Sequence, residues 1–374
     1  MKLNQYIYIS NDWDKRLDLT LDSDNTLVLV FSSLDNPSLQ APLQKLIKAF
    51  PQSKFMGCST AGEMYGNTLA EEHLVVQVIK FEKTILKLVH TKIKDSDYSY
   101  MAGETLSLAL GEPKAVIVLS DGLNVNGSQL TKAFSATLGK KVMVSGGLAG
   151  DDGRFESTWV LIDKEPKSHY IGAVGFYGDE FYFGYGSEGG WSSLGLKRKV
   201  TSSCANILYE LDNQPALSLY KHYLGERANG LPSTGLLFPL GLYSDDEIKV
   251  RSILSVDEEE QSITFAGDIP EGSTVSLMKS SFKSLTDAAV TAVENINFER
   301  ATCEKYCCIA ISCVGRKLVL GQRVEDEIEA VFSAFPSLDV MQIGYYSYGE
   351  ISPSSIDQCD LYNQTMTVVL LGEY

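Results

Sequence analysis

Short apolar runs and amphipathic stretches follow one another in a regular order along the first part of the chain. Residues 26–31 are continuously apolar, which is typical of a strand buried on both faces. Apolar positions in residues 39–50 recur at the i, i+4, i+7 and i+8 spacing of an amphipathic helix. Residues 54–58 then predict a second strand, and the apolar runs at 74–81 and 84–90 suggest a hairpin. This part of the chain therefore predicts a strand–helix–strand–hairpin unit.

The same order of elements recurs after residue 110. A strand, a helix, a second strand and a hairpin-like pair of strands are expected at residues 115–119, 130–138, 141–145, 158–163 and 170–176. Self-similarity at a fixed spacing indicates a repeated supersecondary unit. We therefore expect residues of about 20–95 and about 110–180 to be two copies of one unit.

A related block is expected near the end of the chain. Its strands and helix are predicted at residues 306–314, 328–335, 340–343 and 366–371. The pattern changes after the aromatic and glycine-rich residues 181–191, so we place a domain junction there. The sequence thus predicts an α/β protein with mixed sheets and flanking helices. Its two domains are residues 1–190, which contain the duplicated unit, and residues 191–374, which contain the related block.

Glycine loops that carry a carboxylate follow three of the predicted strands. Two share the same register, Gly57-Cys-Ser-Thr-Ala-Gly-Glu63 and Gly344-Tyr-Tyr-Ser-Tyr-Gly-Glu350. A third, Gly147-Leu-Ala-Gly-Asp151-Asp152, is one residue shorter and carries aspartate in place of glutamate. Glycines at the carboxyl end of a strand allow close backbone approach, and open α/β sheets bind ligands there. The three carboxylates are therefore expected either to face a shared cleft or to brace their own loops.

Composition excludes several classes of function. The formal charge of −16 argues against a nucleic-acid-binding surface, which needs clustered lysine and arginine. The only tight basic run, Lys197-Arg198-Lys199, is typical of a solvated strand end. No stretch approaches the length of a transmembrane helix, and the N-terminus lacks the apolar core of a signal peptide. Seven scattered cysteines suit a reducing cytoplasm better than a disulfide framework.

Other motifs give weak signals. Gly184-x-Gly186-x-x-Gly189 matches the letters of a dinucleotide fingerprint, but no amphipathic helix follows it. The four histidines show no metal-site spacing. Cys58 follows a strand and could serve as a nucleophile, yet no histidine is a clear partner for it. Asp151 and Asp152 form an acidic pair that would also need a base within hydrogen-bond reach.

The chain resembles the FIST proteins, in which a FIST_N region precedes a FIST_C region. The segments that carry the resemblance occur in family order and are Gly57-Cys-Ser-Thr-Ala-Gly-Glu63, Gly146-Gly-Leu-Ala-Gly-Asp151-Asp152, Phe265-Ala-Gly-Asp-Ile-Pro-Glu-Gly-Ser-Thr274, Gly344-Tyr-Tyr-Ser-Tyr-Gly-Glu350-Ile and Cys359-Asp-Leu-Tyr-Asn-Gln-Thr365. The resemblance implies a cytoplasmic sensory module for small ligands, with amino acids as suggested ligands. Proteins of this kind are encoded near signalling proteins.

One branch of the family, the NosP-type nitric-oxide-sensing proteins, binds haem and modulates a histidine kinase. The closing motif of the family usually reads Leu-His-Asn-Gln-Thr, whereas this chain has Tyr362 in place of the histidine. Tyrosine can ligate haem iron but favours the ferric state, which weakens the expectation of a ferrous nitric-oxide sensor. Haem stays a possible cofactor, with Tyr362 and His222 as its candidate iron ligands.

These observations predict a cytoplasmic, non-catalytic sensor that binds a small molecule and acts through a partner such as a histidine kinase. Aromatic rings with a few convergent polar groups are typical of small-molecule pockets. The expected ligand-binding residues are Cys58, Ser59, Glu63, Asp151, Asp152, Tyr345, Tyr346, Tyr348, Glu350, Tyr362 and Asn363. No membrane insertion is expected, and the oligomeric state is open.

Three alternatives belong to other classes of protein. A NosP-type haem sensor would place Tyr362 or a histidine against an apolar cavity. An enzyme would use Cys58, or the pair Asp151 and Asp152, beside a suitable base. A structural adaptor would have no sizeable pocket.

Overall fold

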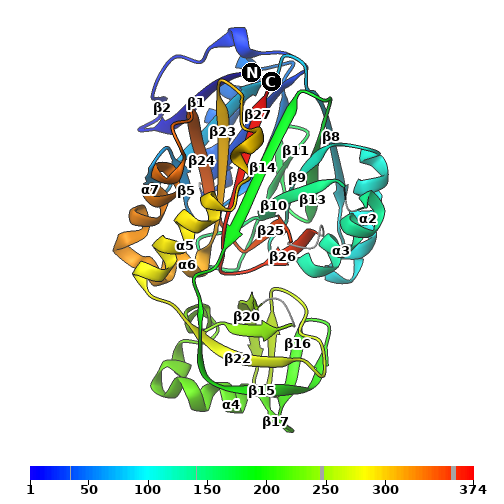
Figure 1. Cartoon of the computed structure of the whole chain (residues 1–374), viewed down its shortest axis with the longest axis vertical. Helices are drawn as coiled ribbons and strands as arrows, with labels where there is room; N and C mark the ends of the chain where they lie inside the picture. The colour runs from blue at the N-terminus through cyan, green and yellow to red at the C-terminus, as the bar shows by residue number, and fades with distance from the viewer. Residues whose placement is uncertain (34, 140, 245–247, 355–358) are drawn as a thin grey trace.

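The body of the protein contains three mixed sheets, as the α/β prediction requires (Figure 1). The computed structural model describes residues 1–33, 35–139, 141–244, 248–354 and 359–374. The first sheet contains β1 (Lys2–Ile9), β2 (Asp12–Trp13), β3 (Thr26–Ser32), β4 (Lys54–Ser59), β7 (Leu74–Lys80), β11 (Val160–Ile162) and β12 (Glu165–Lys167). The second contains β8 (Ile85–Lys92), β9 (Ala115–Ser120), β10 (Met143–Leu148), β13 (Tyr170–Tyr177), β25 (Gly349–Pro353) and β26 (Cys359–Tyr362). The third contains β5 (Glu63–Tyr65), β6 (Thr68–Ala70), β14 (Phe181–Glu188), β23 (Tyr306–Cys313), β24 (Val340–Ser347) and β27 (Met366–Glu373).

The three sheets share one strand arrangement. Each has a central parallel pair, namely β3 with β4, β9 with β10, and β23 with β24. The first strand of each pair also bonds an antiparallel strand, which is β7, β13 or β27. That strand in turn bonds β1, β8 or β14. The three blocks that the sequence pattern singles out therefore have equivalent strand order and direction.

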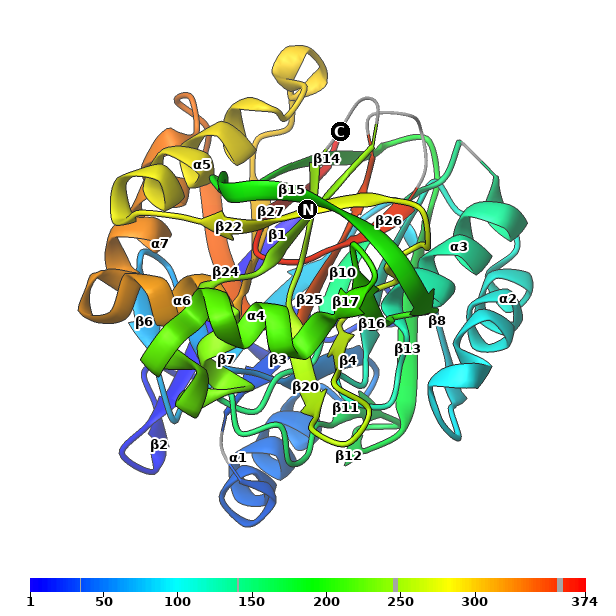
Figure 2. The same cartoon turned by 90° about the horizontal axis from the view of Figure 1, so that it is seen from below.

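Each block also gives a strand to the sheet of another block. β5 from the first block pairs with β24, β11 from the second pairs with β4, and β25 from the third pairs with β10. The exchange is cyclic, so the body has an approximate threefold arrangement. Figure 2 shows the helices in three groups around this arrangement, with α1 in one, α2 and α3 in another, and α5 to α7 in the third.

The strand pairs that the sequence suggests as hairpins are not hairpins. β7 bonds β1 and β3, whereas β8 bonds β13 in a different sheet. Likewise β11 bonds β4 and β12, whereas β13 bonds β8 and β9. These strands follow one another in the chain, but their apolar faces are buried between sheets. Burial rather than sequence proximity selects their partners.

Both faces of the central strands are buried, which explains their continuous apolar sequences. Phe31, Ile117 and Ile309, one from each sheet, belong to a single central core. The alternate positions point outward, and Val30 packs in a second core with Leu43. The helices that cover the sheets are α1 (Asn36–Ala49), α2 (Ser99–Leu110), α3 (Gly127–Leu138), α5 (Phe282–Glu294), α6 (Val314–Leu320) and α7 (Val324–Ala334).

A smaller domain is inserted between β14 and α5, and it projects from one end of the body (Figure 1). Its strands are β15 (Ser192–Cys204), β16 (Ile207–Leu211), β17 (Gln214–Pro215), β18 (Leu240–Tyr243), β19 (Ile248–Arg251), β20 (Ile253–Asp257), β21 (Ser262–Phe265) and β22 (Thr274–Lys279). Helix α4 (Ala216–Leu224) packs on this sheet over a separate apolar core. The chain leaves the body near residue 190, close to the predicted junction, and returns near residue 280. Among the described residues, no helix is both long and apolar enough to cross a membrane.

Candidate functional site

The three glycine loops meet where the three sheets converge. Hydrogen bonds between them are Ala61 N–H to Tyr346 C=O at 2.8 Å, Gly150 N–H to Ser59 C=O at 2.9 Å, Tyr348 N–H to Leu148 C=O at 3.2 Å and, in addition, Tyr346 N–H to Gly62 C=O at 2.9 Å. In the first three of these bonds, each loop donates to one neighbour and accepts from the other, in the same cyclic order as the exchanged strands. The loops therefore satisfy one another's backbone groups.

Each loop begins at a glycine that lies against the neighbouring strand. A Cβ atom on Gly57, Gly146 or Gly344 would lie 2.1, 1.9 or 2.2 Å from the carbonyl oxygen of Val30, Val118 or Ala310. Only glycine fits this approach. Gly146 rather than Gly147 is thus the equivalent of Gly57 and Gly344. The third loop has the same length as the other two, with Asp152 at the position of the glutamates.

Glu63 and Glu350 brace the loops that carry them. Glu350 accepts hydrogen bonds from Ser347 Oγ at 2.6 Å and from Thr365 N–H and Oγ1 at 3.0 and 2.9 Å. Glu63 accepts from Thr60 Oγ1 and, at 3.2 Å, from Ser33 Oγ. Both carboxyls are fully buried. Burial raises the pKa of Glu63 to about 8 and that of Glu350 to about 7, because desolvation disfavours the charged form.

The two aspartates of the middle loop have different surroundings. Asp151 is buried and accepts from three consecutive backbone N–H groups, those of residues 155–157, and from the Tyr348 hydroxyl. Asp152 is exposed and lies 3.1 Å from Lys317 Nζ. The same Lys317 ammonium donates to the Ala61 carbonyl at 2.8 Å. Lys317, from the third block, therefore fastens the first two loops together.

The remaining predicted loop residues lie in the core. Tyr345 stacks on Phe31 with ring centroids 4.6 Å apart, and Tyr346 donates to Glu327 at 2.9 Å. Ser59 Oγ accepts from a backbone N–H at 3.0 Å. Burial raises the pKa of the Cys58 thiol, so the sulfur stays protonated and weakly nucleophilic. The structure brings these residues together and gives Tyr346 and Ser59 internal hydrogen-bond partners, so the role of this group as ligand contacts stays a prediction.

Tyr362 lies opposite Glu350 in the pairing of β25 with β26, and it also lines a cleft between the body and the inserted domain. The cleft has a volume of about 690 Å3 and is lined by Tyr185, Gly186, Ser187, Glu188, Gly189, Gly190, Trp191, Ile248, Val250, Met278, Asn295, Pro353, Ser354, Tyr362 and Thr365. This volume is within the range of about 300–1,000 Å3 that is usual for small-molecule pockets. Thr365 lines the cleft and also donates to Glu350, so one side chain links the cleft to a loop carboxylate.

A buried network joins the two parts of the molecule beside this cleft. Arg316 and Glu327 form an ion pair of 2.6 Å in which neither side chain is exposed. The Arg316 guanidinium also donates to the carbonyls of Gly189 and Gln364. The Gln364 amide reaches into the inserted domain, where it donates to the Leu236 carbonyl at 2.9 Å. Asn363, a predicted ligand residue, takes part in the same joint, because its Oδ1 accepts from a backbone N–H of the inserted domain at 3.4 Å.

Sequence reasoning did not identify Arg316, Glu327, Gln364 or Asp268 as important residues. Asp268 accepts hydrogen bonds from Asn126 at 2.9 Å and Gln129 at 2.7 Å, and it forms an ion pair with Lys132. It thereby docks the inserted domain against the start of α3. Two signals in the sequence pointed to this joint, since Asp268 and Gln364 lie inside two of the motifs that carry the family resemblance.

The described residues do not fit a haem group well. His222 is exposed on α4 and does not line the cleft. Tyr362 does line it, but the only charged side chain in the described lining is Glu188, a carboxylate that would repel haem propionates. Within the described parts of the chain, no group of three or more histidine, cysteine, aspartate or glutamate side chains is arranged to hold a metal ion.

Two family models together match most of the chain. The FIST N domain matches residues 26–214 and the FIST C domain matches residues 216–353. The chain belongs to the FIST family. FIST domains are sensory domains of signal-transduction proteins and bind small ligands.

This FIST protein is similar over most of its length to an archaeal protein. MJ1623 of Methanocaldococcus jannaschii, an uncharacterized protein, is 22% identical over 366 residues, which cover 87% of this chain and 69% of that protein. The solved structure of PurLQS from Thermotoga maritima aligns with 93% of this chain and 66% of its own, at 9% identity. Its TM-score of 0.15 is too low to inform on the fold.

The two buried glutamates predict a pH dependence of stability. Their folded-state pKa values of about 8 and about 7 exceed the usual 4.5. At a pH between 4.5 and the folded-state pKa, each carboxyl therefore binds more protons in the folded protein than in the unfolded chain. The stabilising contribution is fully present below the unfolded pKa and is lost as the pH rises through the folded pKa. We therefore expect the free energy of unfolding to fall with rising pH, by up to about 1.4 kcal/mol per pH unit for each carboxyl.

Chemical denaturation at about pH 5, pH 7 and pH 8.5 measures the slope of the free energy of unfolding against pH. The double variant Glu63→Gln/Glu350→Gln should show a smaller slope than the wild-type protein, because its amides do not titrate. Equal slopes would show that neither glutamate gains a proton on folding.

Proposed function

We propose that this FIST protein is a sensor whose small ligand binds in the cleft between the body and the inserted domain. The observation that carries the proposal is the composition of the cleft walls. Tyr362, Thr365 and Asn295 come from the body, whereas Val250 and Met278 come from the inserted domain. A ligand that contacts both walls favours one relative position of the two parts over others. The glycine loops, in this proposal, brace the body and do not contact the ligand.

The two connections between the body and the inserted domain would act as the hinge. One passes through Gly190, whose backbone has a φ of +73°, and whose Cβ would lie 2.3 Å from the Ser284 carbonyl oxygen. The next residue, Trp191, lines the cleft and donates its indole N–H to the Gln364 carbonyl at 2.9 Å. A ligand beside Trp191 would therefore act directly on the segment that joins the two parts.

An amino acid or a similar small zwitterion suits the polarity of the cleft. Glu188 offers a carboxylate to an ammonium group, and Ser187, Asn295 and Thr365 offer hydroxyl and amide groups. The Trp191 ring and the other apolar side chains would contact an uncharged side chain. The resemblance to FIST proteins suggests the same ligand class.

The signal would pass to a partner protein, for which a histidine kinase is the proposed example. The proposed compartment is the cytoplasm. All seven cysteines lie in described parts of the chain and are free thiols, which suits a reducing environment.

A thermal-shift screen of amino acids, followed by fluorescence titration, tests the ligand site. A ligand that binds the folded protein raises its melting temperature, with a stabilisation of about 2.7 kcal/mol at a hundredfold excess over Kd. We expect Glu188→Gln to weaken binding about 10-fold, because a charge-assisted hydrogen bond is lost. Glu180→Gln, in an exposed turn outside the cleft, should leave affinity unchanged.

Tryptophan fluorescence tests whether the ligand binds in the cleft, beside Trp191. The change on ligand binding should disappear in Trp191→Phe and persist in Trp13→Phe, since Trp191 lines the cleft and Trp13 does not. Equal affinity in both glutamate variants, together with a signal that survives Trp191→Phe, would rule out the cleft. A saturable Soret band on haem titration that moves in Tyr362→Phe would instead establish the haem alternative.

A further inference from the structure

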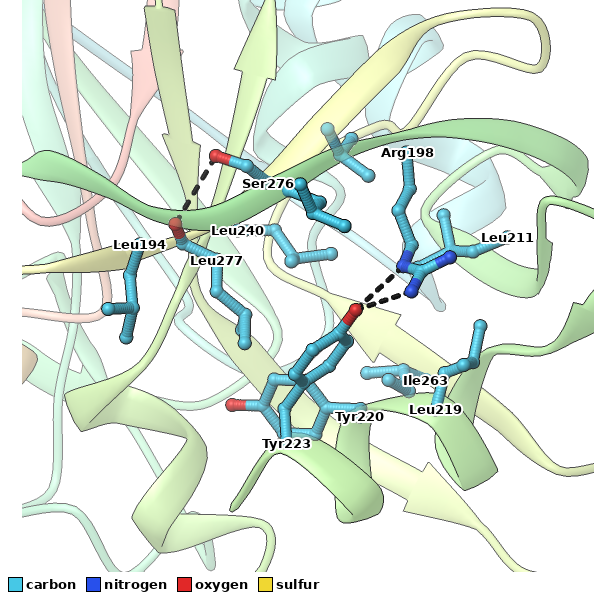
Figure 3. Close-up of a pocket in the computed structure, with 12 residues that line it drawn as sticks. Leu194, Arg198, Leu211, Leu219, Tyr220, Tyr223, Leu240, Ile263, Ser276 and Leu277 are labelled. Atoms are coloured by element: carbon cyan, nitrogen blue, oxygen red, sulfur yellow. Dashed lines mark hydrogen bonds between the residues drawn. The ribbon is translucent and has the colours of Figure 1, made fainter.

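The inserted domain carries an apolar groove on the face between β15 and α4 (Figure 3). Its floor consists of core side chains that include Leu240, Ile263 and Val275. Its rim is open to solvent, because Leu196 is 74% exposed and Tyr223 is 43% exposed. A leucine with three quarters of its surface in water beside an open apolar floor indicates a contact surface rather than a closed core.

The groove is too narrow to be a site for an enclosed ligand. Its free space is about 20 Å3. A single water molecule requires about 10–15 Å3 by the same measure. The apolar surface is therefore suited to side chains that lie across the groove, as at a protein interface, and not to a metabolite inside it.

The β15 segment at the rim has an open backbone edge. β15 bonds β22 at Ser192–Leu194 and again at Arg198, and it bonds β16 only from Val200 onward. In the described part of the chain, the main-chain N–H and C=O groups of residues 192–197 make no hydrogen bond on the side away from β22. An exposed strand edge of this kind is a template for an additional strand.

The charge beside this edge specifies the partner. Lys197 ends the open segment and Arg198 and Lys199 follow it directly, in a chain whose formal charge is −16. Arg198 is held in place by Asp212 at 2.8 Å. It also donates to the Tyr223 hydroxyl at 2.9 Å (Figure 3). Lysines on an edge strand can also discourage pairing. The exposed Leu196 argues against such a protective role for these lysines, because an edge that is protected from strand pairing has no reason to expose a leucine.

We propose that residues 192–197 of β15 dock an extended segment of a partner protein in which apolar and acidic residues alternate. The segment would add as a strand to the open edge. One set of its side chains would cover Leu196 and the groove, and its carboxylates would face the Lys197–Lys199 run. This inference rests on the proposed sensor function, because it names the surface of the sensor that engages the partner. Docking itself requires no ligand in the cleft.

The test uses the full chain without any added small molecule. A displayed library of random dodecapeptides is selected on the wild-type protein, and the enriched peptides are measured by fluorescence anisotropy. We expect enrichment of peptides with alternating apolar and acidic residues. Leu196→Ser should weaken their binding about 10-fold or more, since the apolar contact is lost. Lys197→Glu/Lys199→Glu should weaken it by a similar factor that shrinks as salt is added.

Matched variants on the body serve as controls. Leu108→Ser removes a leucine of comparable exposure, 69%, from α2, and Lys92→Glu reverses a lysine on another edge strand. Both should bind the peptides as the wild-type protein does.

The inference would be overturned by an absence of enriched peptides, by peptides of another composition, or by equal binding to Leu196→Ser. It would also be overturned if Leu196→Ser converted a dimer to a monomer in sedimentation, because a second copy would then cover the groove. Failure of the cleft to bind any ligand would overturn the sensor proposal and leave this result unaffected.

Discussion

Arg316→Met is expected to lower the free energy of unfolding by about 3–5 kcal/mol, the cost of removing one partner from a buried ion pair. Neither Arg316 nor Glu327 has any exposed side-chain surface. Without the guanidinium, the Glu327 carboxylate would keep, among the described residues, the hydroxyl groups of Ser312 and Tyr346 as partners, and neither carries a charge. The carbonyls of Gly189, Gln364 and Leu285 would lose a donor as well.

Chemical denaturation of three variants checks this prediction. The control is Arg323→Met, which breaks an exposed pair with Asp326 and should cost no more than about 1 kcal/mol. The double variant Arg316→Met/Glu327→Gln should recover part of the loss, because no buried charge is left unpaired. An equal cost for Arg316→Met and Arg323→Met would show that the buried network does not hold the joint together.

Gly57→Ala and Gly344→Ala are expected to destabilise the protein by about 3 kcal/mol or more each, because the added methyl group overpacks the core. The new Cβ would lie within 2.1 Å or 2.2 Å of a carbonyl oxygen on the neighbouring strand. Both strands are central in their sheets, so neither can shift without disturbing the ring of hydrogen bonds between the loops.

Gly172→Ala is the matched control, since Gly172 also lies in a central strand. Its Cβ would meet no atom closer than 3.4 Å, which is ordinary van der Waals contact. Its cost should stay below about 1 kcal/mol. Thermal and chemical unfolding measure all three variants. Similar melting temperatures for Gly57→Ala and Gly172→Ala would contradict the close approach of the strands.

The local elements could be predicted from the sequence, because they depend on nearest neighbours in the chain. The apolar runs at residues 26–31, 115–119 and 306–314 became β3, β9 and β23. The glycine loops were also visible, since a glycine at the end of a strand signals close backbone approach. The third block was recognisable for the same reasons.

The pairing of elements could not be predicted, because it depends on residues far apart in the chain. Nothing near Glu63 shows that β5 will pair with β24, some 280 positions later. The predicted hairpins were wrong for the same reason, since the two consecutive strands of each expected pair belong to different sheets. Arg316 was overlooked because its partner Glu327 and its carbonyl acceptors meet only in the folded chain.

The candidate site was partly predictable for a related reason. Motif reasoning found the glycine loops and Tyr362, but it grouped them into one pocket. In the structure the loops close on one another, whereas Tyr362 lies on the cleft beside the inserted domain. The position of that cleft follows from the insertion between β14 and α5, which no local pattern specifies.

Hydrogen–deuterium exchange with and without a saturating ligand tests the central claim most directly. If the ligand binds in the cleft, exchange should slow on both walls, in residues 185–191 of the body and residues 248–250 of the inserted domain. The glycine loops should show no change, because their backbone groups are already bonded to one another. Slower exchange confined to the glycine loops, with both cleft walls unchanged, would contradict the account.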